Sequence, residues 1–292
     1  MCQQLLDQGF QVRALVRNPA KATELAASGA QFIAGDLANP TALQQLVAGC
    51  DAVIHAAGAV RGSSQADFDR VNVAGTAALL LAINAQPHPP LMLLLSSLAA
   101  REAQLSWYAH SKRDGEKLLE SQSGIDYIIV RPPAVYGPGD QEMLPIFQWM
   151  ARGIALVPGA AEARTSLIHV EDLVNAIIAC LRSDSTRGHT LTLCDGQPQG
   201  YNWREMADIA AQHWSRPVRL WCVPRWLLDS VAALNNWTAG LTGRAPMLTP
   251  PKLRELRHED WVVDNAIITA ATGWTPEIPL PRGLEQLKIP AL

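Results

Sequence analysis

Short apolar runs alternate with longer segments of helical periodicity through the first half of the chain. Strands are predicted over residues 10–16, 31–34, 52–56, 90–96 and 127–131, and helices over residues 19–28, 40–48, 68–86 and 108–122. The predicted strands are almost continuously apolar, as parallel strands are when helices cover both faces of their sheet. The alternation therefore predicts an α/β fold with a doubly wound parallel sheet.

The pattern changes near residue 140, where proline and tryptophan become frequent. Eight of the nine tryptophans lie from Trp149 onward. We expect residues 1–140 to form the core domain, and residues 141–292 to combine the last core strands with a smaller, mostly helical lobe. Trp149, Trp203, Trp221, Trp226 and Trp237 could line an apolar pocket, but large aromatic residues are more often plain core residues.

Composition excludes several classes of protein. The net charge of −3 gives no indication of nucleic acid or of an anionic membrane surface as partner. No apolar run has the length of a membrane span, and the first residues do not resemble a secretion signal. The five cysteines are scattered and form no metal-type pair, so we expect reduced thiols, no metal and a cytoplasmic protein.

The N-terminus lacks an expected feature. Sheets that bind a dinucleotide normally begin with a strand and a glycine-rich turn, which brings backbone and a helix N-terminus close to the pyrophosphate. Here residues 2–8 already have the pattern of the following helix, and no G-x-G-x-x-G or G-x-x-G-x-x-G motif occurs elsewhere. We expect an N-terminally incomplete form of a longer protein. The alternative is a real short form that closes the gap or does not bind the cofactor.

The central chemical signal is Tyr108 with Lys112 at the start of a predicted helix. A spacing of four places both side chains on one helix face, where a lysine ammonium would lower the tyrosine pKa and favour proton transfer. The preceding strand ends in Ser96 and Ser97, and a hydroxyl there could hold a substrate oxygen beside Tyr108. We expect only one of these two serines to be catalytic.

Further segments follow in an order that suits a dinucleotide site. His55–Gly58 ends a strand in small residues, where a cofactor could pass close to the backbone. Asn72–Thr76 places the Asn72 amide in a helix that faces the same crevice. Arg131–Gly139 ends a strand in a rigid turn.

Taken together, the motifs Gly35–Leu37, His55–Gly58, Asn72–Thr76, Ser97, Tyr108 with Lys112, Arg131–Gly139, Ser166–Leu173 and Gly273–Pro276 resemble those of a known superfamily. The chain is similar, from Cys2 to about Leu287, to the extended short-chain dehydrogenase/reductases. That group includes nucleotide-sugar epimerases and dehydratases and 3β-hydroxysteroid dehydrogenases. The resemblance implies a Rossmann-type fold, a nicotinamide dinucleotide and a small-molecule substrate. By analogy with the family alone, we expect a homodimer.

The resemblance also implies residue roles. Asp36 and Leu37 would contact adenine, while Ala56, Ala57, Gly58 and Asn72 would line the dinucleotide. Ser97 would bind the substrate oxygen, Tyr108 would act as acid and base, and Lys112 would hold the nicotinamide ribose. Pro133 and Val135 would flank the nicotinamide, whereas His169 and Asp172 would be structural.

Arg17 bears on the choice of cofactor. It follows the second strand of such a fold, where an acidic residue would favour the ribose hydroxyls of NAD. An arginine at this position can instead pair with a 2′-phosphate. The sequence therefore favours NADP over NAD, and the alternative role for Arg17 is a solvated surface residue.

One departure from the family pattern bears on the substrate. Only ten residues separate Ser97 from Tyr108, and a Val-Tyr-Gly segment that is usual in sugar-nucleotide enzymes is absent. We therefore expect an NAD(P)-dependent oxidoreductase that interconverts a ketone and a secondary alcohol of a less polar metabolite. Two alternatives are an epimerase or dehydratase with tightly bound NAD(P), and a non-catalytic dinucleotide sensor or assembly subunit.

Overall fold

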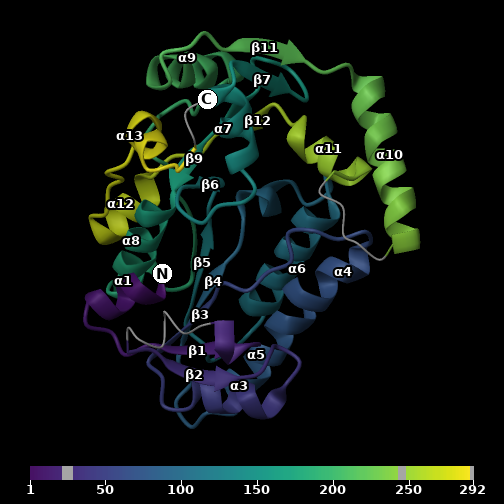
Figure 1. Ribbon diagram of the computed structural model, residues 1–292. Coiled ribbons are helices and arrows are strands. Elements are labelled where there is room, and N and C mark those ends of the chain that lie inside the picture. Colours follow the sequence, from purple (N-terminus) through teal and green to yellow (C-terminus); the bar gives the residue numbers. More distant parts are fainter. Residues whose placement is uncertain (22–28, 243–247, 290–292) are drawn as a thin grey trace.

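A four-stranded parallel sheet forms the centre of the molecule (Figure 1). The computed structural model describes residues 1–21, 29–242 and 248–289. The strand order is β10-β5-β4-β3, with β3 at Ala52–His55, β4 at Leu91–Leu95, β5 at Tyr127–Arg131 and β10 at His189–Thr192. The predicted α/β class is confirmed, and Tyr127–Arg131 has the predicted bounds.

Strands β1 (Arg13–Val16) and β2 (Gln31–Ala34) form a parallel pair of their own. Within the described residues, neither shares a hydrogen-bonded ladder with β3, the edge strand of the central sheet. The expectation that the first strand and its glycine turn are missing remains a prediction.

Helices cover both faces of the central sheet, as Figure 1 shows. One face is covered by α3 (Pro40–Val47), α5 (Ala74–Asn84) and α6 (Trp107–Glu120), with α4 (Gln65–Asn72) beside α6. The other face is covered by α8 (Val170–Leu181) and α12 (Ala266–Thr272), with α1 (Cys2–Asp7) packed on α8. The two resulting apolar layers explain why the strands are apolar on both sides.

The helix predicted over Phe68–Gln86 is wrong in one respect, because it breaks at Val73 into α4 and α5. The Thr76 hydroxyl donates to the Asn72 carbonyl at 2.8 Å. A hydroxyl bonded to the carbonyl four residues back competes with the helix ladder and bends the helix. Of the helix predicted over residues 19–28, Pro19–Lys21 forms a 3₁₀ turn, and residues 22–28 lie outside the described part of the chain.

The second half combines helices with short parallel strand pairs. Besides α8 and α12, its described helices are α7 (Leu144–Ala151), α9 (Trp203–His213), α10 (Arg225–Thr242), α11 (Pro250–Leu256) and α13 (Leu280–Glu285). A 3₁₀ turn occupies Asp184–Thr186, and another, Leu98–Glu102, follows β4 in the first half. Parallel pairs join β6 (Ala134–Tyr136) with β9 (Leu167–His169), β7 (Ile154–Val157) with β11 (Arg219–Cys222), and β8 (Arg164–Thr165) with β12 (Asp260–Trp261). None of the described helices is long and apolar enough to cross a membrane.

A buried carboxylate joins α6 to the ends of two central strands. Glu116 of α6 is fully buried and accepts hydrogen bonds from Ser96 Oγ at 2.5 Å and from Arg131 Nε at 2.8 Å. Arg113 of the same helix donates to Glu116 Oε2 at 2.9 Å. Since Ser96 follows β4 and Arg131 ends β5, Glu116 fixes α6 against the carboxyl ends of both strands.

Glu116→Gln is expected to lower the free energy of unfolding by about 3 kcal/mol, because it breaks a buried ion pair and leaves the partly buried guanidinium of Arg131 without its counter-charge. Urea unfolding followed by circular dichroism measures the change. The matched control is Glu120→Gln, since Glu120 also binds Arg113 at 2.9 Å but is partly exposed. Its expected effect is below about 1 kcal/mol, and equal losses in the two variants would contradict the role given to Glu116.

Candidate active site

The start of α6 places Tyr108 and Lys112 at the carboxyl end of the central sheet. The Ser106 hydroxyl caps this helix by accepting from Ala109 N at 3.0 Å. Tyr108 then lies in the first turn and Lys112 one turn later, so both side chains are on the helix face that points to the ends of β3 and β4. Open parallel sheets bind their ligands at this edge.

Ser97 and Tyr108 are brought together by this arrangement. The Ser97 hydroxyl hydrogen-bonds the Tyr108 side chain and accepts from Ala99 N at 3.2 Å. The neighbouring Ser96 is bound to Glu116 in the protein interior instead. The structure thus separates the two serines, and Ser97 is the one that faces the tyrosine.

Lys112 is buried beside the end of β4. Its Nζ donates to the Leu95 carbonyl at 2.8 Å. Burial lowers the pKa of Lys112 to about 8, against the opposing effect of Glu116. An ammonium carries three donors, and within the described residues only one has a protein partner, so two remain for ligand hydroxyls.

The expected lowering of the Tyr108 pKa is wrong for this structure. Burial is the largest effect and raises the pKa of Tyr108 to about 12; Ser97 opposes the rise, and the carboxylates of Glu255 and Glu142 add to it. The Lys112 ammonium is turned to the Leu95 carbonyl rather than to the phenol. Tyr108 is therefore protonated at neutral pH.

The end of β3 offers exposed backbone next to Lys112. Ala56, Ala57 and Gly58 are exposed, and a Cβ added to Gly58 would lie 3.2 Å from Lys112 Nζ. Asn72 stabilises this loop, since its amide oxygen accepts from Ala59 N at 2.8 Å and its amide nitrogen donates to Ser111 Oγ at 2.9 Å. The Asn72 amide thus holds the loop in place. The exposed backbone of residues 56–58 lies next to the free donors of Lys112, an arrangement that fits a bound dinucleotide.

Arg17, Asp36 and Leu37 lie at the carboxyl ends of β1 and β2. Arg17 and Asp36 are exposed, and the Asp36 carboxylate accepts from Ala38 N at 2.9 Å. Leu37 is partly buried against Gly75 of α5, where an added Cβ would meet it at 2.7 Å. These residues form a separate group, held by the β1–β2 pair rather than by the central sheet.

Pro133 and Val135 follow β5 and are partly exposed at the same edge of the sheet. His169 and Asp172 are buried at the start of α8. The Asp172 carboxylate accepts from the backbone N–H of Ile278 at 2.8 Å and of Glu277 at 3.1 Å. Asp172 thus ties α8 to the C-terminal segment, as expected for a structural residue.

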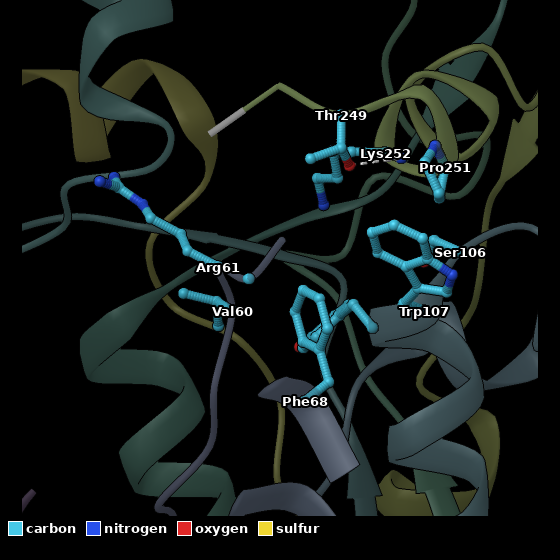
Figure 2. A pocket seen from close by; sticks show the side chains of 10 residues that line it. Val60, Arg61, Phe68, Ser106, Trp107, Thr249, Pro251 and Lys252 are labelled. Atoms are coloured by element: carbon cyan, nitrogen blue, oxygen red, sulfur yellow. Dashed lines mark hydrogen bonds between the residues drawn. The ribbon is translucent and has the colours of Figure 1, made fainter. Parts of the chain in front are cut away.

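A pocket beside Tyr108 is lined by residues 60–68, by the start of α6 and by residues 249–252 at the start of α11 (Figure 2). Its lining comprises Val60, Arg61, Gly62, Phe68, Ser106, Trp107, Tyr108, Thr249, Pro251 and Lys252. Lys252 of α11 places its Nζ 5.5 Å from the centre of the Tyr108 ring and pairs with Glu255. Glu255 in turn accepts from Ser106 Oγ at 2.7 Å.

Sequence reasoning missed Lys252 and Glu255. The signal available for α11 was its start, where Thr249 caps the helix ahead of two prolines. That signal predicts a helix but not which site the helix adjoins. Among the described residues, no cluster of three metal-binding side chains occurs, and all five cysteines are free.

His55 lies beneath this edge and is buried between β3 and α5. Its Nε2 is 3.0 Å from Thr76 Oγ1, whose only hydrogen goes to the Asn72 carbonyl, so Nε2 is the donor. Burial, with a smaller effect from Lys112, lowers the pKa of His55 to about 4. In the folded protein the His55 ring is therefore neutral and carries its proton on Nε2.

Comparison with known proteins gives consistent matches. A family model described as the NAD dependent epimerase/dehydratase family matches residues 1–194. A ceramide reductase of Caulobacter vibrioides is 35% identical over 263 residues, which cover 90% of this chain and 81% of that protein. A 2-alkyl-3-oxoalkanoate reductase of Shewanella oneidensis is 29% identical, over 99% of this chain and 82% of that protein.

Solved structures share the fold. A UDP-glucuronic acid 4-epimerase of Bacillus cereus, solved with NAD, superposes with a TM-score of 0.71 at 18% identity. The superposition covers 98% of this chain and 92% of the epimerase. At this level of identity the likeness establishes the fold alone.

The low pKa of His55 makes folding stability depend on pH. Between pH 6.5 and 4 the unfolded chain binds a proton at His55 that the folded chain does not, so stability rises with pH in this window. Wild-type protein should lose about 3 kcal/mol more than His55→Gln as the pH falls from 7 to 4. Urea titrations at several pH values measure the difference. The control is His88→Gln, at an exposed position, which should show the same dependence of unfolding free energy on pH as the wild type. If His55→Gln also shows the wild-type dependence on pH, the low pKa of His55 is contradicted.

Proposed function

This chain belongs to the NAD-dependent epimerase/dehydratase family, and we propose that it reduces a ketone to a secondary alcohol with NADPH as the hydride donor. As an NAD(P)-dependent enzyme of this family, it uses a nicotinamide dinucleotide. The observation that carries the proposal is the hydrogen-bonded pair of Ser97 and Tyr108 beside the buried ammonium of Lys112. A protein that only binds the dinucleotide would not need this pair.

The proposed chemistry follows from these three side chains. The dinucleotide supplies the hydride that adds to the carbonyl carbon. Ser97 donates a hydrogen bond to the substrate oxygen and orients it toward Tyr108. Tyr108 donates its phenolic proton to that oxygen as the carbon–oxygen double bond becomes single, and it regains a proton from solvent. Lys112 would hold ribose hydroxyls of the dinucleotide with its two remaining donors.

The protonation state of Tyr108 favours the reductive direction. With a pKa of about 12, the phenol retains its proton at neutral pH. A proton donor is needed to make an alcohol from a ketone, whereas the reverse reaction would require the tyrosinate. The free enzyme therefore carries the proton donor that formation of the alcohol requires.

The substrate is proposed to be an amphiphile with a ketone close to a polar head. Phe68, Trp107 and Pro251 give the pocket apolar walls, while Arg61 and Lys252, each paired with a glutamate, supply polar groups. The names of the two reductases that resemble this chain, a ceramide reductase and a 2-alkyl-3-oxoalkanoate reductase, describe molecules of this kind. The close sequence spacing of Ser97 and Tyr108 argues against a sugar nucleotide.

Tyr108→Phe should abolish ketone reduction while NADPH binding persists. Loss of a positioned acid typically costs 10²–10⁴-fold in rate. The measurement is NADPH oxidation with a 3-oxo amphiphile, alongside fluorescence titration of NADPH. Tyr127→Phe, which removes a phenol from the far end of β5, should retain the activity of the wild type. Full activity in Tyr108→Phe would overturn the mechanism, and loss of NADPH binding would show a structural defect.

Arg17→Ala should raise the Kd for NADPH by about 10- to 100-fold and leave that for NADH unchanged, since a charge-assisted hydrogen bond to a phosphate is worth about 1.5–3 kcal/mol. Titration with both dinucleotides measures the ratio. Arg70→Ala serves as a control, because Arg70 is an exposed arginine on α4. Equal weakening for both dinucleotides would remove the basis for NADP preference.

A further inference from the structure

Two tryptophans of the second half project into solvent. Trp221 of β11 is 60% exposed and Trp226 in the first turn of α10 is 70% exposed. Trp149 of α7 is 41% exposed, so the interpretation of these three residues as core is wrong. Figure 1 shows β11 and α10 at the periphery of the molecule, far from the central sheet.

Other exposed apolar side chains lie on α10 and on the strand paired with β11. Leu156 of β7 is paired in register with Trp221, so both point to the same side of the β7–β11 ribbon. On α10, exposed Leu227, Val231 and Leu234 are spaced by four and three residues and form one stripe. We call the set the apolar ridge: Leu156, Trp221, Trp226, Leu227, Val231 and Leu234.

The part of the apolar ridge on α10 faces away from the rest of the protein. The side of α10 that carries fully buried Ala232 is turned inward, and α10 packs against α11. The stripe of Leu227, Val231 and Leu234 therefore does not belong to the fold's own core. Exposed aromatic and aliphatic side chains gathered in this way usually mark a binding surface.

The segment of residues 209–228, which carries both tryptophans, contains basic but no acidic residues. Arg216, Arg219 and Arg225 are exposed, and the chain has no acidic residue between Asp208 and Asp229. The Asp229 carboxylate is neutralised by Arg257 of the neighbouring segment at 2.7 Å. The segment that carries the tryptophans is thus positively charged, although the net charge of the whole chain is −3.

We propose that the apolar ridge and its arginines dock the protein on an anionic phospholipid bilayer, with α10 lying along the surface. Tryptophan and leucine side chains partition into the boundary between headgroups and acyl chains, and arginines bind anionic headgroups. A second copy of the chain suits the ridge less well. A symmetric dimer across the ridge would bring the arginines of both copies into one interface, and residues 209–228 supply no acidic side chain to pair with them.

Docking on this surface would bring the pocket close to the bilayer. Helix α10 packs on α11, and α11 carries Lys252, whose Nζ is 5.5 Å from the ring centre of Tyr108. An amphiphilic ketone could then pass from the bilayer to the pocket without crossing water. This last step rests on the proposed reductase function, whereas docking itself does not.

Sedimentation with sucrose-loaded vesicles tests the docking without any turnover. The full chain is mixed with vesicles of phosphatidylcholine alone or with a fraction of phosphatidylglycerol. Binding is expected only to the anionic vesicles and should weaken in 0.5 M NaCl, because salt screens the arginines. A blue shift of tryptophan fluorescence should accompany binding.

Three variants separate the contributions. Trp221→Ser/Trp226→Ser should reduce partitioning at least tenfold, and Arg216→Gln/Arg219→Gln/Arg225→Gln should reduce it by ~100-fold at low salt, at about 1 kcal/mol per arginine. The matched control is Leu81→Ser/Ile267→Ser, which removes two exposed apolar side chains (73% and 57%) from α5 and α12. It should bind as wild type. Circular dichroism and NADPH titration verify that each variant is folded.

Two outcomes would overturn the proposal. One is absence of binding to anionic vesicles, or equal binding by wild type and the Trp221→Ser/Trp226→Ser variant. The other is a concentration-dependent dimer, seen by analytical ultracentrifugation without vesicles and lost in the same variant, which would assign the ridge to contact between copies of the chain. Because no ketone is present in either assay, failure of docking leaves the proposed reductase activity to be tested by itself.

Discussion

The carboxylate of Glu116 is the interaction on which the geometry of the site depends. It is buried where α6 meets the carboxyl ends of β4 and β5, and it accepts from Ser96 and Arg131. A buried carboxylate tolerates little displacement, because any lost partner leaves desolvated charge. The same contact that removes Ser96 from the surface leaves Ser97 turned toward Tyr108. One ionic cluster thus sets both the position of the helix and the choice of serine.

The pKa values of Tyr108 and Lys112 depend more on burial than on the spacing of these two residues along the helix. The four-residue interval between Tyr108 and Lys112 predicts their shared face correctly, but not the direction in which the ammonium points. Lys112 donates to a backbone carbonyl at the end of β4, and desolvation raises the pKa of Tyr108. A local pattern places two side chains near one another, whereas their protonation depends on every group that surrounds them.

The sequence predicted the central strands and helices well, because their apolar periodicity follows from burial on two sides. It could not predict the break at Val73, which comes from a side-chain bond of Thr76, nor the choice between adjacent serines. Lys252 and Glu255 escaped prediction because Glu255 meets Ser106 across 149 positions of the chain. The exposure of Trp221 and Trp226 is likewise a tertiary property, since tryptophan occurs in cores and at interfaces alike.

The two ends of the dinucleotide region are held by different means. The end near Tyr108 is attached to the central sheet through Glu116. The end near Arg17 belongs to the β1–β2 pair, where the Arg13 guanidinium lies within 2.8–3.1 Å of three carbonyl oxygens near the end of α3. Helix α3 packs on α5, so this pair is joined to the molecule through the helix layer. Binding one dinucleotide across both ends would therefore connect two parts of the structure that share no ladder among the described residues.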